Sequence, residues 1–305
     1  MKLLNIVKRM VNLARRNHAQ LVSIQQALGR IEERQCLAGS FKYFNDYEYQ
    51  VFSQWGEDGL IQHIINNVEI QRNIFVEFGV QDYTESNTRF LIKNSNWAGL
   101  VIDGSLENVE YIKNDEIYWR HNLKAHCEFI TKDNINNILT KNGIDGDIGL
   151  LSVDIDGNDY WVWEAITCIN PRIVVCEYNS VFGDSAAVTV PYDDSFVRNA
   201  AHYSNLYYGA SISALNYLAI KKGYKLVGSN SAGNNLFFVR EDVGQHLPSV
   251  SPQDAYIKSN FREGRDEKGK LLNITSVEGF KLIEDQILFD VKTKQEITVH
   301  DAVKY

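Results

Sequence analysis

The chain has 305 residues, of which 44% are apolar and 23% charged, a composition typical of soluble proteins that bury a substantial core. Its formal net charge of -8 argues against a general nucleic-acid binder, because such a surface would repel phosphates. The four cysteines form no CxxC pair, which argues against a zinc knot or a disulfide framework. Lys8 and Arg9 interrupt the first apolar residues and no run approaches transmembrane length, so we expect a cytoplasmic protein.

Residues 1–35 predict one long helix with a coiled-coil seam, because apolar residues recur at alternating spacings of four and three. The seam positions are Leu3, Val7, Met10, Ala14, Asn17, Leu21, Ile24, Leu28 and Ile31. An Asn on such a seam usually fixes register and oligomer number, which indicates a homo-oligomer. Two alternatives remain open. The helix packs on its own domain, or its basic residues hold it on an anionic membrane surface. Those basic residues are Lys2, Lys8, Arg9, Arg15 and Arg16.

Beyond this helix, apolar strands alternate with amphipathic helices, which is the pattern of a parallel sheet covered by helices. The expected strands cover residues 74–77, 98–103, 148–155 and 172–177, with another at either 117–121 or 127–130. The expected helices cover residues 58–68, 86–94, 108–112, 133–140, 160–166 and 213–222. Strands at 224–227 and 236–239 are expected to be antiparallel neighbours, because their connection is short. A long polar loop at 182–194 is of the kind that closes over a site, and 286–299 alternates like a hairpin.

Acids stand where four of the predicted strands end, at Glu77, Asp103, Asp154 and Glu177. In a parallel sheet these ends lie along one edge, where open α/β folds bind their ligands. A single acid after a strand is more often a helix cap or a turn residue, but four in succession indicate a binding edge.

The glycine pattern after the first strand indicates the class of ligand. Gly79 stands alone, whereas a dinucleotide fingerprint needs G-x-G-x-x-G to approach a pyrophosphate, and the acidic loop that follows would repel phosphate. Asp103 is placed where an acid typically accepts hydrogen bonds from a ribose. A ligand with ribose and adenine, no phosphate and a cationic centre fits this lining, and S-adenosylmethionine is such a ligand.

Six motifs together resemble the FkbM-type methyltransferases, which are class I S-adenosylmethionine-dependent enzymes. The motifs are SQWGED at 53–58, FVEFG at 75–79, SNTRFL at 86–91, NWAGLVID at 96–103, LLSVDIDGND at 150–159 and RIVVCEYN at 172–179. The resemblance covers about residues 53–240 and implies a Rossmann-like class I sheet, mostly parallel with its last strand antiparallel. It implies that Glu77 and Gly79 hold the methionine and ribose end of the cofactor and that Asp103 takes the ribose hydroxyls, with Asp154 beside them. The chain departs from the family at QDYTE, residues 81–85, where a small glycine-containing loop is more usual.

A second constellation follows the fourth and fifth of the sheet strands. Asp154, Glu177 and Asn179 offer oxygen ligands of the kind that Mg²⁺ prefers, and they resemble the acids that bind Mg²⁺ in macrocin-type sugar O-methyltransferases. A metal there would hold and polarise a sugar diol. Metal-free proton transfer by Asp156 or by His202 is the alternative, with Asp156 the favoured base.

We therefore expect three units: the helix at 1–35, a Rossmann-like methyltransferase domain at 36–240 and a C-terminal extension with a hairpin at 241–305. The expected function is S-adenosylmethionine-dependent O-methyl transfer to a sugar hydroxyl of a bacterial surface glycan or a glycosylated metabolite. The acceptor and the choice between oxygen and nitrogen stay open. The alternative is a non-catalytic Rossmann-like scaffold that assembles through its N-terminal helix.

Overall fold

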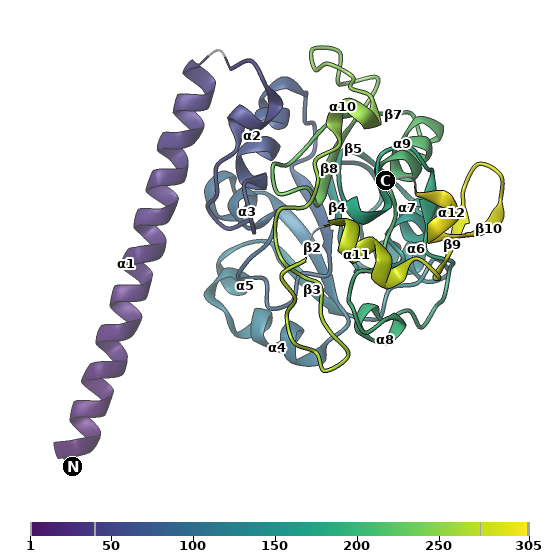
Figure 1. Cartoon of the computed structure of the whole chain (residues 1–305). Helices are drawn as coiled ribbons and strands as arrows, with labels where there is room; N and C mark the ends of the chain where they lie inside the picture. Colours follow the sequence, from purple (N-terminus) through teal and green to yellow (C-terminus); the bar gives the residue numbers. More distant parts are fainter. Residues whose placement is uncertain (1, 40, 275, 304–305) are drawn as a thin grey trace.

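The central sheet determines where the predicted site residues lie (Figure 1). The computed structural model describes residues 2–39, 41–274 and 276–303. In these ranges the sheet strands are β1 (Ile74–Phe78), β2 (Ala98–Asp103), β3 (Leu123–Cys127), β4 (Gly146–Val153), β5 (Ile169–Glu177), β7 (Tyr224–Ser229) and β8 (Asn235–Arg240). Their order is β3-β2-β1-β4-β5-β8-β7, with β8 antiparallel to both of its neighbours and β1 to β5 parallel. The predicted fold class, a mostly parallel Rossmann-like sheet with an antiparallel last strand, is confirmed.

Both faces of the sheet are buried, which is why its strands are almost wholly apolar. Successive side chains point to opposite faces, so Phe75 and Leu150 pack on one side while Val76 and Leu151 pack on the other. The covering helices are α2 (Glu57–Asn67), α3 (Arg89–Ser95), α4 (Leu106–Asn114), α5 (Glu116–Arg120), α6 (Ile135–Lys141), α7 (Asp159–Ala165) and α9 (Ile212–Lys221). Helices α2 to α5 lie on the side of the N-terminal helix, and α6, α7 and α9 cover the opposite face (Figure 1).

Both predicted positions for the third strand are wrong. Residues 117–121 fall almost entirely within α5, because the Asp115 side chain accepts a hydrogen bond from Ile117 N and caps that helix. The strand starts at Leu123 and pairs in parallel with β2 as far as Cys127 beside Asp103. Of the second predicted range, 127–130, only Cys127 belongs to the strand.

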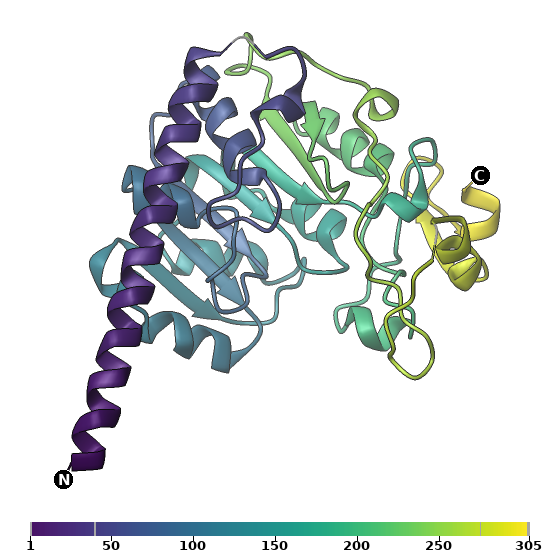
Figure 2. The same cartoon turned by 60° about the vertical axis from the view of Figure 1, so that its left-hand side comes forward.

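The two halves of the N-terminal helix α1 (Lys2–Ala38) have different surroundings (Figure 2). Its second half lies on the domain, where Val22 and Cys36 pack on the cluster of Tyr49, Val51, Phe52 and Phe90. At Gly29 an added Cβ would stand 2.5 Å from a Val51 methyl carbon, so this close approach requires glycine. The first half extends beyond the domain.

The predicted seam lies on a separate face of α1 and remains exposed. Its described apolar residues are exposed by 47% to 66%, namely Val7 51%, Met10 66%, Leu21 64%, Ile24 56%, Leu28 57% and Ile31 47%. The side chains of Leu3, Lys2 and Arg15 lie outside the described residues. Packing on its own domain therefore does not use the seam. In the described part of the chain, no helix has the length and apolarity that crossing a bilayer requires.

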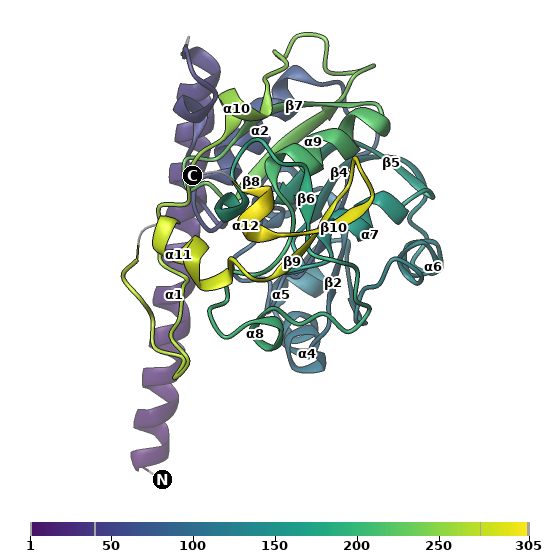
Figure 3. The ribbon, with the colours of Figure 1, turned by 45° about the vertical axis from the view of Figure 1, so that its right-hand side comes forward.

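The C-terminal extension is joined to the domain by a second sheet (Figure 3). Its strands are β6 (Val188–Thr189), β9 (Ile287–Asp290) and β10 (Gln295–Thr298), in the order β10-β9-β6, so the predicted hairpin is confirmed. The loop predicted at 182–194 is wrong in part, because β6 lies within it and is buried against β9. The remaining helices are η1 (Phe44–Tyr47), η2 (Ser180–Phe182), α8 (Arg198–Ala201), α10 (Pro252–Ala255), α11 (Ser276–Ile283) and α12 (Val299–Ala302). Residues 275 and 304–305 of the predicted extension lie outside the described residues.

Candidate functional site

Three cavities meet at the carboxyl ends of β1 and β4, and Gly79 and Asp154 line all of them. Gly79 has φ +68°, and a Cβ at this position would stand 1.8 Å from the Asp154 carbonyl oxygen. Only glycine permits this approach, so the glycine that ends the motif FVEFG brings the ends of two neighbouring strands together. The site lies beside β1, where the order of the strands reverses, which is the usual place for a ligand in such sheets.

Each cavity is lined by residues from a different part of the sheet's carboxyl edge. The ribose-side cavity is lined by Gln81, Asp103, Gly104, Phe129 and Ile130. The loop cavity, of about 350 Å³, is lined by Gln54, Glu77, Asp82, Ser86 and Asn87. The acidic cavity, of about 640 Å³, is lined by Asp154, Asp156, Glu177, Arg198 and Glu263, among others. Small-molecule sites commonly have volumes in the range of the last two.

Glu77 is buried with both carboxylate oxygens occupied. One oxygen accepts Asn87 N at 2.8 Å, and the other accepts Thr88 N at 3.1 Å and the Thr88 hydroxyl. Burial raises the pKa of Glu77 to about 7, although these hydrogen bonds act in the opposite direction. Glu77 thus lines the loop cavity, and its oxygens hold the backbone that leads into α3.

The unusual loop QDYTE is built without glycine. Gln81 and Tyr83 have φ values of +49° and +62°, a region that glycine normally occupies. Tyr83 is fully buried and its hydroxyl lies 2.9 Å from the Thr88 hydroxyl, while Arg89 donates to the Tyr83 carbonyl at 2.6 Å. Buried side-chain contacts therefore stabilise a conformation that a glycine would adopt more readily.

Asp103 ends β2 and organises the ribose-side cavity. Its Oδ2 accepts Gln81 N at 2.8 Å, and its Oδ1 accepts Ser105 N at 2.8 Å and the Asn108 side chain at 3.0 Å. A carboxylate oxygen has more than one lone pair, so Oδ2 retains room for a further donor such as a ribose hydroxyl.

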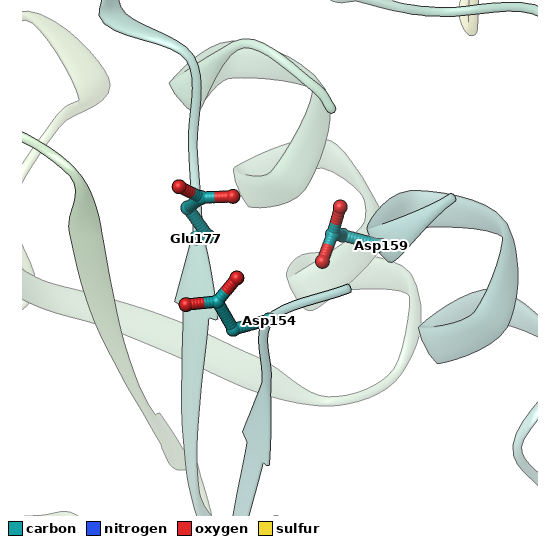
Figure 4. A group of neighbouring side chains, drawn as sticks. All are labelled: Asp154, Asp159 and Glu177. Carbon is teal, nitrogen blue, oxygen red and sulfur yellow. The ribbon is translucent and has the colours of Figure 1, made fainter. Parts of the chain in front are cut away.

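Three acids converge where β4, β5 and α7 meet (Figure 4). Carboxylate oxygens of Asp154, Asp159 and Glu177 all lie within 4.8 Å of one another. Glu177 Oε2 is buried without a hydrogen-bond partner, and none of the described residues donates a hydrogen bond to the Asp154 carboxylate. Burial and the neighbouring acids raise the pKa of both residues well above the usual range. Such a set of oxygens fits a divalent cation, which would relieve this repulsion.

Arg198 provides a partly buried positive charge beside these acids. It donates to Asp156 Oδ1 at 2.6 Å, to the Asn205 carbonyl at 2.8 Å and to Glu263, and its guanidinium lies 3.5 Å from the centre of the Tyr208 ring. Burial lowers the pKa of Arg198, but Tyr208 and the nearby acids Glu177 and Glu263 raise it by more, so this residue stays charged. Asp156 has φ +56° and points toward this guanidinium from the edge of the acidic cavity.

Two predicted site residues have other roles in the structure. The Asn179 side chain donates to the carbonyls of Leu206 and Tyr208 and accepts Val181 N, so its polar atoms cap η2. Asp159, rather than Asn179, lies with its carboxylate oxygens close to those of Asp154 and Glu177. His202 Nδ1 lies 2.7 Å from the Ser204 hydroxyl, the ring lies against Tyr203, and the residue lines none of the three cavities.

The sequence reasoning missed Asp159, Arg198 and Glu263. Asp159 stands in the motif LLSVDIDGND, where a third acid five residues after Asp154 was the available signal. Its oxygens accept Ile155 N at 2.8 Å and Gly157 N at 2.9 Å, which folds the turn back on β4. No local signal connects Arg198 with Glu263, because they are 65 residues apart and meet only through the C-terminal segment.

No family model matches this chain, and no protein with a curated description matches it. Among solved structures it is similar to TrmK of M. capricolum in complex with the natural cofactor product S-adenosyl-homocysteine, at 9% identity and a TM-score of 0.36, over 62% of this chain and 70% of that one. It is also similar to the N-terminal domain of EvdMO1 with this product bound, at 8% identity and a TM-score of 0.40, over 69% and 94%. The O-methyltransferase of Bacillus cereus shows 11% identity and a TM-score of 0.36, over 55% and 74%. These likenesses concern the fold alone.

Proposed function

We propose that this protein is an S-adenosylmethionine-dependent O-methyltransferase of the FkbM type that acts on a sugar hydroxyl. The observation that carries the proposal is the junction at Gly79 and Asp154, where the cavity beside Asp103 and the acidic cavity share lining residues. A cationic, phosphate-free cofactor suits this lining, because the acids attract a sulfonium and repel a pyrophosphate.

The residues divide into a donor side and an acceptor side. Asp103 and Gly104 would hold the ribose and adenine portion, and the loop cavity beside Glu77 would take the methionine portion. When bound, S-adenosylmethionine supplies an electrophilic methyl group on sulfur. On the acceptor side, Asp156 would take the proton of the attacking hydroxyl while Arg198 holds the orientation of its carboxylate. Alignment of the acceptor with the methyl group would supply most of the acceleration.

Asp154, Asp159 and Glu177 would hold Mg²⁺, which when bound polarises a sugar diol. Isothermal titration calorimetry with Mg²⁺ tests this part separately from turnover. We expect binding to the wild type and none to Asp154→Asn. Absence of binding, together with turnover that persists in EDTA, would leave Asp156 acting without a metal.

Calorimetry with S-adenosylhomocysteine tests the cofactor assignment. We expect binding that Asp103→Ala weakens at least about tenfold, which corresponds to about 1.4 kcal/mol. Asp133→Ala, which removes an acid outside the three cavities, is the matched control. If the wild type binds neither S-adenosylmethionine nor its product, the proposal is wrong. A screen of labelled methyl transfer against nucleotide sugars and surface-glycan fractions then identifies the acceptor.

A non-catalytic scaffold fits these observations less well. A buried carboxylate without a hydrogen-bond partner, such as that of Glu177, lowers stability. A scaffold protein that binds no ligand at this site would gain nothing in return. Cofactor binding without transfer to any acceptor in the screen would favour the scaffold.

We also propose that α1 joins two or more copies of the chain through its exposed seam. The basic residues Lys8, Arg9 and Arg16 lie off the seam positions, so they do not oppose pairing there. Most helical stability in proteins comes from the packing of an apolar face, and a partner helix would cover these exposed apolar residues. We expect Leu21→Glu with Leu28→Glu to lower the molar mass in light scattering, and Arg16→Glu to leave it unchanged. A monomeric wild type would contradict this part and leave contact with an anionic membrane surface as the alternative.

A further inference from the structure

The segment between α10 and α11 forms one wall of the acidic cavity. We call residues 257–274 the closing segment. Figure 1 shows it descending past the central sheet. It brings Phe261, Arg262, Glu263 and Arg265 to the cavity. The acceptor would therefore meet side chains from the last quarter of the chain as well as the acids of the sheet.

Specific contacts fix the position of the closing segment. Tyr178 donates its hydroxyl to the Ile257 carbonyl at 2.5 Å, and Ser180 Oγ accepts Ser259 N at 2.9 Å. Further along, Arg265 N donates to the Ser204 carbonyl at 3.0 Å. Between these points the Phe261 ring stacks on Trp55 with the ring centres 5.4 Å apart. The backbone that carries Arg262 and Arg265 is thus anchored on both sides.

The three arginines of this cavity differ in what they already bind. Arg198 already pairs with two acids, Asp156 and Glu263, and donates to the Asn205 carbonyl. Arg262 and Arg265 are exposed, and neither takes part in the ion pairs found among the described residues. Arg265 donates one N–H to the Gly269 carbonyl at 3.0 Å, which leaves most of its donors available.

Charge in the acidic cavity therefore changes from the buried part to the mouth. Glu177 is only 7% exposed and lies with Asp154 at the end of the sheet, whereas Arg262 and Arg265 lie in solvent. Guanidinium groups bind phosphate through paired N–H donors, so Arg262 and Arg265 can hold a phosphorylated ligand at the mouth of this cavity.

We propose that the acceptor is a phosphorylated sugar whose phosphate binds Arg262 and Arg265 while its hydroxyl end reaches Asp154 and Asp156. This inference rests on the proposed methyl transfer and names its substrate class. The phosphate belongs either to a sugar monophosphate or to the diphosphate of a nucleotide sugar, and both present the same oxygens to the arginines.

Binding to the full-length protein saturated with S-adenosylhomocysteine tests the inference by calorimetry in a phosphate-free buffer. The probes are glucose, glucose 1-phosphate, UDP-glucose and inorganic pyrophosphate, the last of which carries no sugar. We expect the phosphorylated probes to bind more tightly than glucose and to weaken as NaCl is raised, because the arginines are exposed. Tighter binding of UDP-glucose than of glucose 1-phosphate identifies the nucleotide sugar as the source.

Paired variants test which residues are responsible. Arg262→Gln with Arg265→Gln should weaken the phosphorylated probes at least about tenfold, or about 1.4 kcal/mol. Lys268→Gln with Lys270→Gln removes the same charge from the same segment outside the cavity and should change affinity less than about twofold. Equal losses in the two double variants, or no binding of any phosphorylated probe at millimolar concentration, would overturn the inference.

The affinity for S-adenosylhomocysteine separates this result from the proposed function. Cofactor binding without phosphate binding rejects the phosphorylated acceptor and leaves methyl transfer intact. Phosphate binding that requires the arginines, in a protein that binds no cofactor, rejects the methyltransferase and with it the substrate class.

Discussion

The acids at the two sides of the binding edge have opposite surroundings. On the side of β1 and β2, Glu77 and Asp103 have hydrogen bonds from the chain on all four carboxylate oxygens. On the side of β4 and β5, Asp154 receives none from the described residues, and Glu177 keeps a buried oxygen without a partner. Acids at the ends of neighbouring strands thus hold the backbone in one half of the candidate site, and in the other half they keep oxygens without a hydrogen-bond donor among the described residues.

Glu177→Gln should have the largest effect of the variants that test this difference, because it changes an acid that we propose binds a ligand. Loss of one carboxylate from the acidic group should lower methyl transfer to the acceptor from the screen at least about 100-fold, which corresponds to about 2.7 kcal/mol. Thermal unfolding should stay unchanged or rise, because an uncompensated buried acid is removed. Glu241→Gln, an exposed acid at the end of β8, is the control. Lower stability with normal transfer would place Glu177 on the structural side instead.

Glu77→Ala should have the opposite pattern, in which the main loss is in stability. Backbone N–H groups of Asn87 and Thr88 lose their acceptor, so the free energy of unfolding should fall by about 2–4 kcal/mol in chemical denaturation. Glu85→Ala, an exposed acid of the same loop, should change it by less than about 0.5 kcal/mol. A stable Glu77→Ala protein that no longer binds S-adenosylhomocysteine would show that Glu77 is a cofactor ligand.

The raised pKa of Glu77 predicts how stability depends on pH. Its value of about 7 in the folded protein exceeds the ordinary value of 4.5, so the folded state binds this proton more tightly than the unfolded chain. The stability gained is complete below the unfolded pKa and is lost as pH rises through 7. Across a denaturation series from about pH 4 to 8, the free energy of unfolding should fall by about 3 kcal/mol because of this residue, at 1.36 kcal/mol for each of the roughly 2.5 units between the two pKa values. The curve of Glu77→Gln should be flatter by that amount, and parallel curves would contradict the prediction.

Gln81→Gly should have the smallest effect on stability. It tests how strongly the loop after β1 is held in its present conformation. Glycine adopts the φ of +49° at lower cost, so stability should rise by up to about 1 kcal/mol, measured as a higher melting temperature. The neighbouring Glu85→Gly lacks this advantage and should lower stability by about 0.5–1 kcal/mol. A destabilised Gln81→Gly would mean that the Gln81 side chain holds the loop.

The sheet could be predicted from the sequence because its signal is local. Runs such as Ile74–Phe78 are apolar on both faces, and that pattern survives in any arrangement with two layers of helices. The third strand could not be located in the same way. Its residues Leu123–Cys127 read LKAHC, a half-exposed edge strand, while the more apolar residues around Ile117 are helical because Asp115 caps them.

The candidate site was predictable where function depends on position along a strand. Glu77, Asp103, Asp154 and Glu177 were found because parallel strands end at one edge. The partner of each carboxylate was not predictable, because Asn87, Asn108 and Arg198 reach the acids from loops and helices whose paths the strand pattern does not specify. The same limitation applies to Glu263, which only the path of the closing segment brings to Arg198.

The contact between Gly79 and the Asp154 carbonyl has a consequence for the distance over which a methyl group would travel. The ends of β1 and β4, beside which the proposed donor and acceptor would bind, touch through backbone atoms at a spacing that leaves no room for a methyl side chain. Side-chain changes in either cavity can therefore alter which molecule binds without altering how far apart the two binding places lie. Because this backbone contact fixes the spacing, substitutions that change which acceptor binds would leave the geometry of methyl transfer intact.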